Sequence, residues 1–275
     1  QNHNRQSQYS QHQNRRRQYK LAAEWRAKII TLCMPLIFNK RQRSGGTLFC
    51  VWKISESEEA LLSLLSPCLQ TYYMPQLKAM HSDKRRLEWL AVRVVAHKVA
   101  NVDGHIIYDN QGIPAVDSRS RHISISHSGD TVFVAFSARR IGVDVQYYSD
   151  KLLKVAAHFI NEEELNNINS GLLIDKSQVD GIYYKNNGTT QITSKIKRAH
   201  LLIWGAKESI YKLCGIKDLD LKNCVTVDVR DVYRYGCIAA TVNPDYVKNN
   251  PVKSRKITIK YMFSGDCVYV VAEDD

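Results

Sequence analysis

Features that mark several other classes of protein are missing from this chain. No apolar run approaches the roughly 20 residues that a membrane-spanning helix needs, and the first residues do not follow a signal-peptide pattern. The seven cysteines include no Cys-x-x-Cys pair, which argues against a structural zinc site. An odd, scattered set of cysteines is typical of reduced thiols in the cytoplasm. We therefore expect a cytoplasmic protein that does not bind a membrane.

The composition is that of a folded protein with an uneven charge. The chain has 275 residues, of which 44% are hydrophobic, so it can bury a substantial core in one or two domains. Its formal net charge is +12. Residues 1–33 hold seven basic residues and one acidic residue, which gives +6 and leaves +6 for the remainder. A moderately basic folded part suits an anionic cofactor and an acidic protein partner, and it does not require nucleic acid.

Composition also divides the chain into segments. Residues 1–19 have almost no apolar groups, so we expect 1–33 to be a disordered basic extension rich in Gln, Asn and Arg. Two α+β subdomains are predicted over 34–139 and 140–275. A polar stretch at about 170–197, with several glycines and paired asparagines, is predicted to be an insertion in the second subdomain.

Apolar periodicity predicts an α+β fold in which a helix followed by three strands occurs twice, near 83–146 and 199–272. This repeated order favours two similar halves with a ligand cleft between them. Helices are predicted over 56–65, 83–100, 151–159, 162–168 and 199–213, with Ser55 and Asn161 as caps. Strands are predicted over 47–54, 105–108, 121–127, 131–138, 140–146, 224–230, 236–242, 256–263 and 267–272.

The helical segment Trp204–Lys212 carries a carboxylate between two lysines, Lys207 and Lys212. Trp204, Glu208 and Lys212 stand four residues apart and therefore share one face of the helix. A metal-binding acid beside ammonium groups is what a polyphosphate ligand needs. Glu and Lys at this spacing are also common on solvated helix surfaces. The segment therefore indicates a binding site only in combination with two others.

Those two segments lie earlier in the chain, on predicted strands. In Gly142–Gln146, Asp144 and Gln146 are two residues apart and point to the same face of the strand. In Ile125–Ser128, a histidine stands between two serines at the end of a strand, before a hairpin turn. An aspartate or a histidine at a strand end usually has a structural role, and it is the combination that indicates a site.

Together and in this order, the three segments resemble the 4'-phosphopantetheinyl transferases, and most of all the larger single-chain group with two lobes. The resemblance covers roughly residues 35–272. It implies two pseudo-symmetric α+β subdomains with the active site at their interface. It also implies an enzyme that uses Mg²⁺ to move the 4'-phosphopantetheine arm of coenzyme A onto a serine of an acyl or peptidyl carrier protein, releasing adenosine 3',5'-bisphosphate. Fatty-acid synthesis is one setting for this reaction, and a monomer is sufficient for it.

The resemblance assigns a role to each candidate residue. Asp144, Gln146 and Glu208 would hold the metal, with Gln146 offering a neutral oxygen. Glu208 and Asp144, with Lys212 on the diphosphate, would form the catalytic set. Coenzyme A phosphates would also be bound by basic and hydroxyl groups, namely Ser126, His127 and Lys207.

One helix supplies further candidates for phosphate binding. Arg86, Arg93 and His97 recur along one stripe of the predicted helix 83–100. The stripe is either a solvated basic face or a set of phosphate contacts, for which arginine is well suited. The resemblance places a basic cofactor-binding residue in this helix, so Arg86 and Arg93 are both carried as candidates.

Two positions depart from the family pattern and keep other functions open. The family has a second acid where this chain has Gln146, and often a lysine where it has Ile113. These changes favour, as an alternative, an inactive transferase-like protein that only binds coenzyme A or a carrier protein. A second alternative is a nucleic-acid-binding or metal-dependent nuclease module, based on the basic extension and on the acidic pair Asp144 and Glu208.

Overall fold

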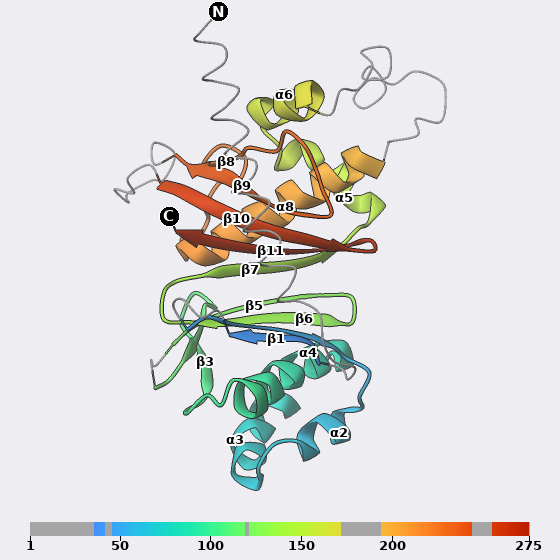
Figure 1. Cartoon of the computed structure of the whole chain (residues 1–275). Helices are drawn as coiled ribbons and strands as arrows, with labels where there is room; N and C mark the ends of the chain where they lie inside the picture. Colours follow the sequence, from blue (N-terminus) through green and yellow to red (C-terminus); the bar gives the residue numbers. More distant parts are fainter. Residues whose placement is uncertain (1–35, 42–45, 119–120, 172–193, 244–254, 275) are drawn as a thin grey trace, which may run out of the picture.

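The chain forms a mixed α+β fold of antiparallel sheets covered by helices (Figure 1). The computed structural model describes residues 36–41, 46–118, 121–171, 194–243 and 255–274. The predicted basic extension 1–33 and most of the predicted insertion 170–197 lie outside these residues. No helix in the described part of the chain is long and apolar enough to cross a membrane.

The first lobe is a four-stranded sheet packed against helices. Its strand order is β1 (Leu36–Arg41), β2 (Leu48–Lys53), β6 (Thr131–Ser137) and β5 (His122–Ser128). Its helices are α2 (Glu58–Ser63), α3 (Pro67–Lys78) and α4 (Asp83–Val94), and α4 continues as a π-helical turn, Val95–Val99. A small hairpin, β3 (Ile106–Tyr108) and β4 (Pro114–Val116), leads into β5. The apolar face of α4 packs against β6 and buries the core of this lobe.

The second lobe is a five-stranded sheet that curls around one long helix. Its strand order is β7 (Gly142–Tyr147), β11 (Cys267–Asp274), β10 (Arg255–Ser264), β9 (Tyr235–Val242) and β8 (Val225–Val227). The long helix is α8 (Ser194–Cys214), which packs against β7, β11, β10 and β8. The smaller helical segments are α5 (Asp150–Lys154), a 3₁₀ turn (Ala156–His158) and α6 (Glu162–Gly171). Figure 1 shows the two sheets at the centre of the molecule, with most of the helices outside them.

Serine hydroxyls join the two lobes where β5 lies beside β7. The backbone N–H groups of Val143, Val145 and Tyr147 donate to the hydroxyl oxygens of the alternate serines on β5, at N···O distances of 3.0, 3.2 and 3.1 Å. The acceptors are, in the same order, Ser124, Ser126 and Ser128. The alternate spacing places all three hydroxyls on one side of β5. Each strand is at the end of its own sheet, so these bonds satisfy edge N–H groups that neighbouring strands leave free.

An apolar cluster reinforces the junction between the sheets. Phe49, Phe133 and other residues of β2 and β6 pack against the first residues of β7 and against β11. The rings of Phe133 and Tyr269 meet edge to face, with centroids 5.9 Å apart. Burial of this shared apolar surface keeps the two lobes together.

Glycine allows α8 to lie directly on β7. A Cβ atom at Gly142 would overlap the backbone carbonyl oxygen of Ser209 in α8. The first residue of the Gly-Val-Asp segment is therefore required by packing. This close approach places Lys212 Nζ 2.7 Å from Asp144 Oδ1. It also brings Glu208 near enough to interact with both side chains.

Most of the predicted elements are confirmed, with differences at their ends. The predicted helix 83–100 is α4 plus the π-helical turn, and α8 begins at Ser194, five residues earlier than predicted. Asn161 does cap α6, because its side-chain oxygen accepts from Glu164 N at 2.9 Å, whereas Ser57 takes the capping role predicted for Ser55. Helix α3 and strands β1 and β4 were not predicted.

The serine bonds at the junction predict a measurable contribution to stability. Ser124→Ala removes the acceptor of a buried N–H group on Val143. We therefore expect the free energy of unfolding to fall by about 1–3 kcal/mol. Urea denaturation followed by circular dichroism measures this change. Ser63→Ala, at an exposed helix position, is the matched control and should change stability by less than about 0.5 kcal/mol. Equal effects of the two substitutions would mean that the junction bond contributes nothing.

Candidate active site

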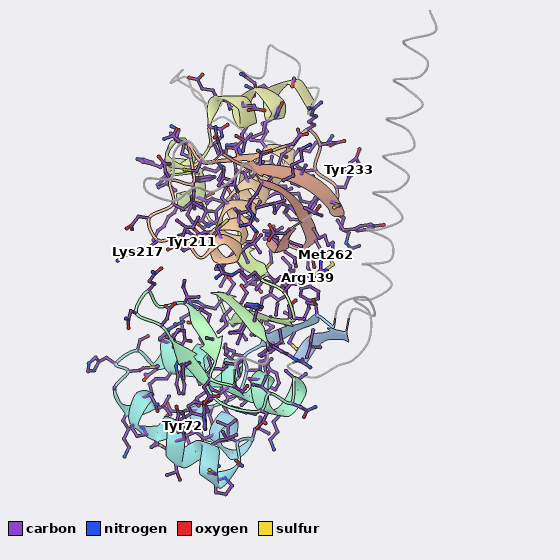
Figure 2. The ribbon with its side chains drawn as sticks, turned by 90° about the vertical axis from the view of Figure 1, so that its left-hand side faces the viewer. Tyr72, Arg139, Tyr211, Lys217, Tyr233 and Met262 are labelled. Carbon is purple, nitrogen blue, oxygen red and sulfur yellow. The ribbon has the colours of Figure 1, made fainter. Side chains whose placement is uncertain are left out.

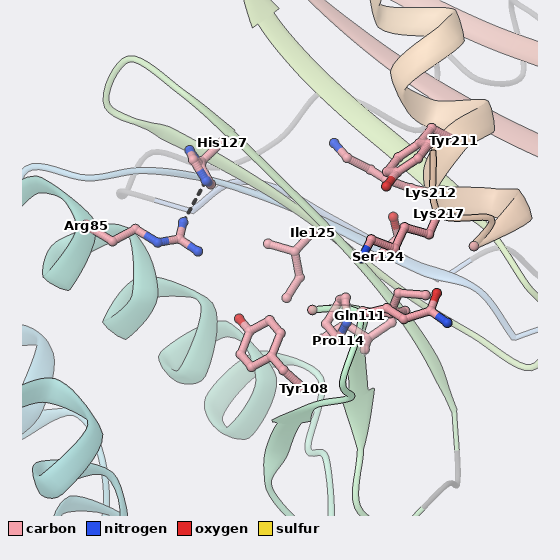
Figure 3. Close-up of a pocket in the computed structure, with 14 residues that line it drawn as sticks. Arg85, Tyr108, Gln111, Pro114, Ser124, Ile125, His127, Tyr211, Lys212 and Lys217 are labelled. Atoms are coloured by element: carbon pink, nitrogen blue, oxygen red, sulfur yellow. Dashed lines mark hydrogen bonds between the residues drawn. The ribbon is translucent and has the colours of Figure 1, made fainter. Parts of the chain in front are cut away.

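A cleft lies between the two lobes, where α4, the β3–β4 hairpin, β5 and the end of α8 meet (Figure 3). It contains a cavity of about 250 Å³. A second cavity of about 470 Å³ adjoins it and shares Ile113, Lys212 and Gly215 with it. Tyr211 and Lys217 mark the edge of the second lobe that faces the first (Figure 2). The first cavity is lined by Arg85, Tyr108, Gln111, Gly112, Ile113, Pro114, Ile123, Ser124, Ile125, His127, Tyr211, Lys212, Gly215 and Lys217.

The lining is basic. Arg85, Lys212 and Lys217 face the first cavity together with His127, and no carboxylate among the described residues does. The adjoining cavity adds two arginines and a histidine: Arg121, Arg140 and His122. The acidic residue that the structure describes in this cavity is Asp109, whose carboxylate accepts from two backbone N–H groups of its own loop. Such a surface attracts a ligand that carries several negative charges.

Asp144 lies behind this lining with one oxygen satisfied and one free. Its Oδ1 accepts from the Ser126 hydroxyl and from Lys212 Nζ, each at 2.7 Å. Its Oδ2 is buried and has no hydrogen-bond partner among the described residues. A buried carboxylate oxygen without a donor is costly, which makes this atom a good place for a cation. Gly205 of α8 lies close to this acid: a Cβ atom there would stand 3.6 Å from Oδ2, an ordinary contact, and 2.9 Å from a methyl group of Val270, which is too close.

Glu208 is close enough to Asp144 for the two carboxylates to interact. It is half-buried on α8, one turn before Lys212. Burial raises the pKa of Glu208, the charge of Lys212 lowers it, and the charge of Asp144 raises it again. The structure therefore brings together the three residues that the sequence analysis named as the catalytic set. Gln146 is on the same strand as Asp144, and its amide N donates to the Tyr147 carbonyl at 3.1 Å.

His127 and Arg85 contact each other at one end of the cleft. Arg85 Nη1 lies 2.6 Å from His127 Nε2, as the dashed line in Figure 3 shows. Arg85 was not among the predicted residues. Helix phase was the signal that could have identified it, because adjacent helical residues point about 100° apart and Leu90 and Val94 fix which side is buried.

Three residues predicted to bind the cofactor are directed elsewhere. Arg86 makes a two-bond ion pair with Glu58, at 2.7 and 2.5 Å. Arg93 is 1% exposed and stacks on the ring of Trp89, with its guanidinium carbon 3.5 Å from the ring centroid. Neither arginine lines the described cavities.

Lys207 is the third of these residues, and it is fully buried inside the second lobe. Its Nζ donates to the carbonyl oxygens of Phe159 and Leu221 and forms an ion pair with Glu164 at 2.8 Å. Burial lowers the pKa of Lys207 and raises that of Glu164, while their mutual attraction opposes both shifts. Lys207 thus fastens α8 to the loops around α6 and does not face the cleft. Trp204, one turn earlier, packs edge to face on Phe159.

The difference between Arg85 and Arg86 yields a test that requires no knowledge of the reaction. Arg85→Gln should weaken the binding of inorganic pyrophosphate about tenfold or more, because a charge-assisted bond is lost from the cleft. Arg86→Gln, the matched neighbour, should leave binding unchanged. Isothermal titration calorimetry measures both constants. A loss of affinity in the Arg86 variant alone would show that the cleft is not the anion site.

The chain was also compared with known proteins. No family model matches it, and no curated protein was found to be similar to it. Its function is therefore inferred from the cleft and from the three sequence segments that surround it.

Proposed function

We propose that this protein is a magnesium-dependent 4'-phosphopantetheinyl transferase, which moves the phosphopantetheine arm of coenzyme A onto a serine of a carrier protein. One observation carries the proposal. Three segments that are far apart in the sequence meet beside one basic cleft: Lys212 lines it and pairs with Asp144, and Glu208 interacts with both. A coenzyme with three phosphate groups and a metal-dependent transfer would need this combination of charges.

The arrangement of the lobes supports the same proposal. Each lobe has a helix packed on an antiparallel sheet, α4 in the first and α8 in the second, and the cleft opens where the sheets meet. This is compatible with the two related subdomains of the larger single-chain transferases. An active site at their interface would receive residues from both, as this cleft does.

The residues present fit a divalent cation of the Mg²⁺ type. Asp144 Oδ2 has no partner among the described residues, and Glu208 is its acidic neighbour. Gln146 would add a neutral oxygen, and Mg²⁺ commonly completes its shell with water and phosphate oxygens. When bound, the ion would supply positive charge to the diphosphate as the leaving group forms.

The chain's own residues would bind and orient the two substrates. Lys212 Nζ already donates to Asp144 Oδ1 and to the Val143 carbonyl, so its ammonium is fixed at the wall of the cleft. From there it would bind the diphosphate of coenzyme A. Arg85 and His127 would bind a phosphate at the other end of the cavity. Charges held in place before the reaction stabilise a transition state at little reorganisation cost.

Proton transfer from the acceptor serine is assigned to Glu208. The serine oxygen forms a bond to the phosphorus that carries the pantetheine arm, and the bond from that phosphorus to adenosine 3',5'-bisphosphate breaks. The serine proton passes to the Glu208 carboxylate, whose pKa is raised by burial and therefore suits a general base. No covalent intermediate with the protein is required.

An inactive protein that only binds coenzyme A is the second candidate. It is favoured by Gln146 and by Ile113, which lines the cavity at the position where the family often has a lysine. A transfer assay distinguishes the two candidates directly.

Transfer should depend on both carboxylates. Incubated with coenzyme A, Mg²⁺ and a carrier protein, the wild type should add the mass of the phosphopantetheine arm, as read by mass spectrometry. Asp144→Asn and Glu208→Gln should each reduce the rate by about a hundredfold or more, because each removes a charge that acts on the reacting phosphate. Glu163→Gln, at an exposed position of α6, is the matched control. A folded Glu208 variant with normal transfer would exclude this mechanism.

Gln146 should limit the affinity for magnesium. Gln146→Glu adds a negative charge two residues from Asp144, and we expect the magnesium concentration needed for half-maximal activity to fall roughly tenfold. The measurement is a magnesium titration of the transfer rate, with binding of Mn²⁺ followed by electron paramagnetic resonance as an independent readout. An unchanged titration would remove Gln146 from the metal site.

A further inference from the structure

A buried carboxylate lies directly beneath the two residues that form one end of the cleft. Glu88, on α4, is 5% exposed. Its Oε2 lies 3.2 Å from His127 Nδ1 and 3.4 Å from Arg85 Nη1. Lys84, one turn earlier, is 3.9 Å from the other oxygen. A buried acid with such contacts controls the charge and orientation of the groups it touches.

The contacts determine which nitrogen of His127 carries the proton. A guanidinium can only donate, so Arg85 Nη1 at 2.6 Å requires that His127 Nε2 be the acceptor. The neutral imidazole then carries its hydrogen on Nδ1, which faces the Glu88 carboxylate. The chain Arg85–His127–Glu88 is therefore satisfied only when the ring is neutral with its proton on Nδ1.

Three cations and one carboxylate act electrostatically on this ring. Arg85 and Lys84 face it from α4, and Lys212 faces it from α8, while Glu88 is the opposing carboxylate. Burial lowers the pKa of His127, Glu88 raises it, and the three cations lower it further. A phosphate group entering the cleft would add negative charge on the cationic side and compete with Nε2 for Arg85.

We propose that Glu88 is a positioning residue for the phosphate-binding end of the cleft, and that phosphate binding at Arg85 is coupled to proton uptake by His127. The coupling rests on the proposed function, in which this end binds a phosphate of coenzyme A. When the phosphate binds the Arg85 guanidinium, His127 Nε2 loses the hydrogen bond from Arg85 and accepts a proton from solvent. The ring then donates from Nε2 to the phosphate and from Nδ1 to Glu88.

The direction of the pH dependence follows from this exchange. The bound anion raises the pKa of His127 above its value in the free protein. Affinity should therefore rise as the pH falls from the bound-state pKa to the free-state pKa, and should be constant below both. A phosphate monoester also titrates near pH 6. His127→Gln removes only the contribution of the ring, so the difference between it and the wild type isolates the coupling.

The ligand-free protein provides the first test. Two-dimensional ¹H–¹⁵N spectra of the histidine rings report which nitrogen carries hydrogen, and His127→Gln assigns the signal. We expect the Nδ1–H form in the wild type and a mixture of forms in Glu88→Gln. An Nε2–H form in the wild type would overturn the proposal, whatever the protein catalyses.

Binding provides the second test. Calorimetric titrations with coenzyme A and with inorganic pyrophosphate, each in two buffers of different ionisation enthalpy, give the protons taken up. The wild type should take up more protons than His127→Gln, and Glu88→Gln should bind coenzyme A about tenfold more weakly at neutral pH. Glu59→Gln, at an exposed acid on α2, is the matched control and should bind normally.

The outcomes separate this inference from the proposed function. Proton uptake with pyrophosphate but no binding of coenzyme A would support the coupling and reject the transferase. Equal proton uptake by the wild type and His127→Gln would overturn the coupling while leaving the transferase intact. Binding of neither ligand would overturn both. Because Glu88→Gln removes a buried charge and can impair folding, the wild-type spectrum and His127→Gln decide the question without it.

Discussion

Three serine hydroxyls on β5 determine where the two lobes meet, and the site depends on that junction. Each hydroxyl accepts from an alternate N–H group of β7, so one strand cannot slide along the other without losing all three bonds. Ser126 connects the junction to the candidate site, because its hydroxyl accepts from Val145 N and donates to Asp144 Oδ1. The position of the acid relative to the cleft is therefore a consequence of how the sheets are joined.

The second contribution to the site comes from the close packing of α8 on β7. Gly142 lets the helix backbone reach β7, and Gly205 lets the same helix approach Val270 of β11. The buried pair Lys207–Glu164 fastens the opposite side of the same helix to the loops behind it. A buried ion pair is weak evidence of net stability, but it fixes the rotation of α8, and that rotation decides which residues face the cleft.

The sequence predicted the residues whose geometry is local and missed those whose partners are distant. The spacing of Glu208 and Lys212, and the alternation that aligns Gln146 with Asp144, follow from a single helix and a single strand. Lys207 was expected at the cofactor and is buried instead, because its partner Glu164 is 43 positions away in the sequence and local spacing does not reveal that contact. Arg86 was named because it shares a stripe with Arg93 and His97, and Arg85, which lies off that stripe, was not considered.

Helix α3 was missed for a different reason. It contains Pro67 and Pro75, and its polar and apolar residues are not segregated strongly enough to show a helical period. Proline at the first helical position is nevertheless favourable, and Ser66 before it is a good cap.

The cleft is basic, yet two of its cations are each held by a carboxylate behind them. Lys212 is paired with Asp144 and Arg85 with Glu88, so both are fixed before a ligand arrives. The two acids differ in whether both of their carboxylate oxygens have a partner. Glu88 contacts cations and a histidine through both oxygens, whereas Asp144 keeps one buried oxygen without a partner among the described residues. In the proposed function, a divalent cation would be held at Asp144 and not at Glu88, so the metal would lie on the Lys212 side of the cleft and the outer phosphate on the Arg85 side.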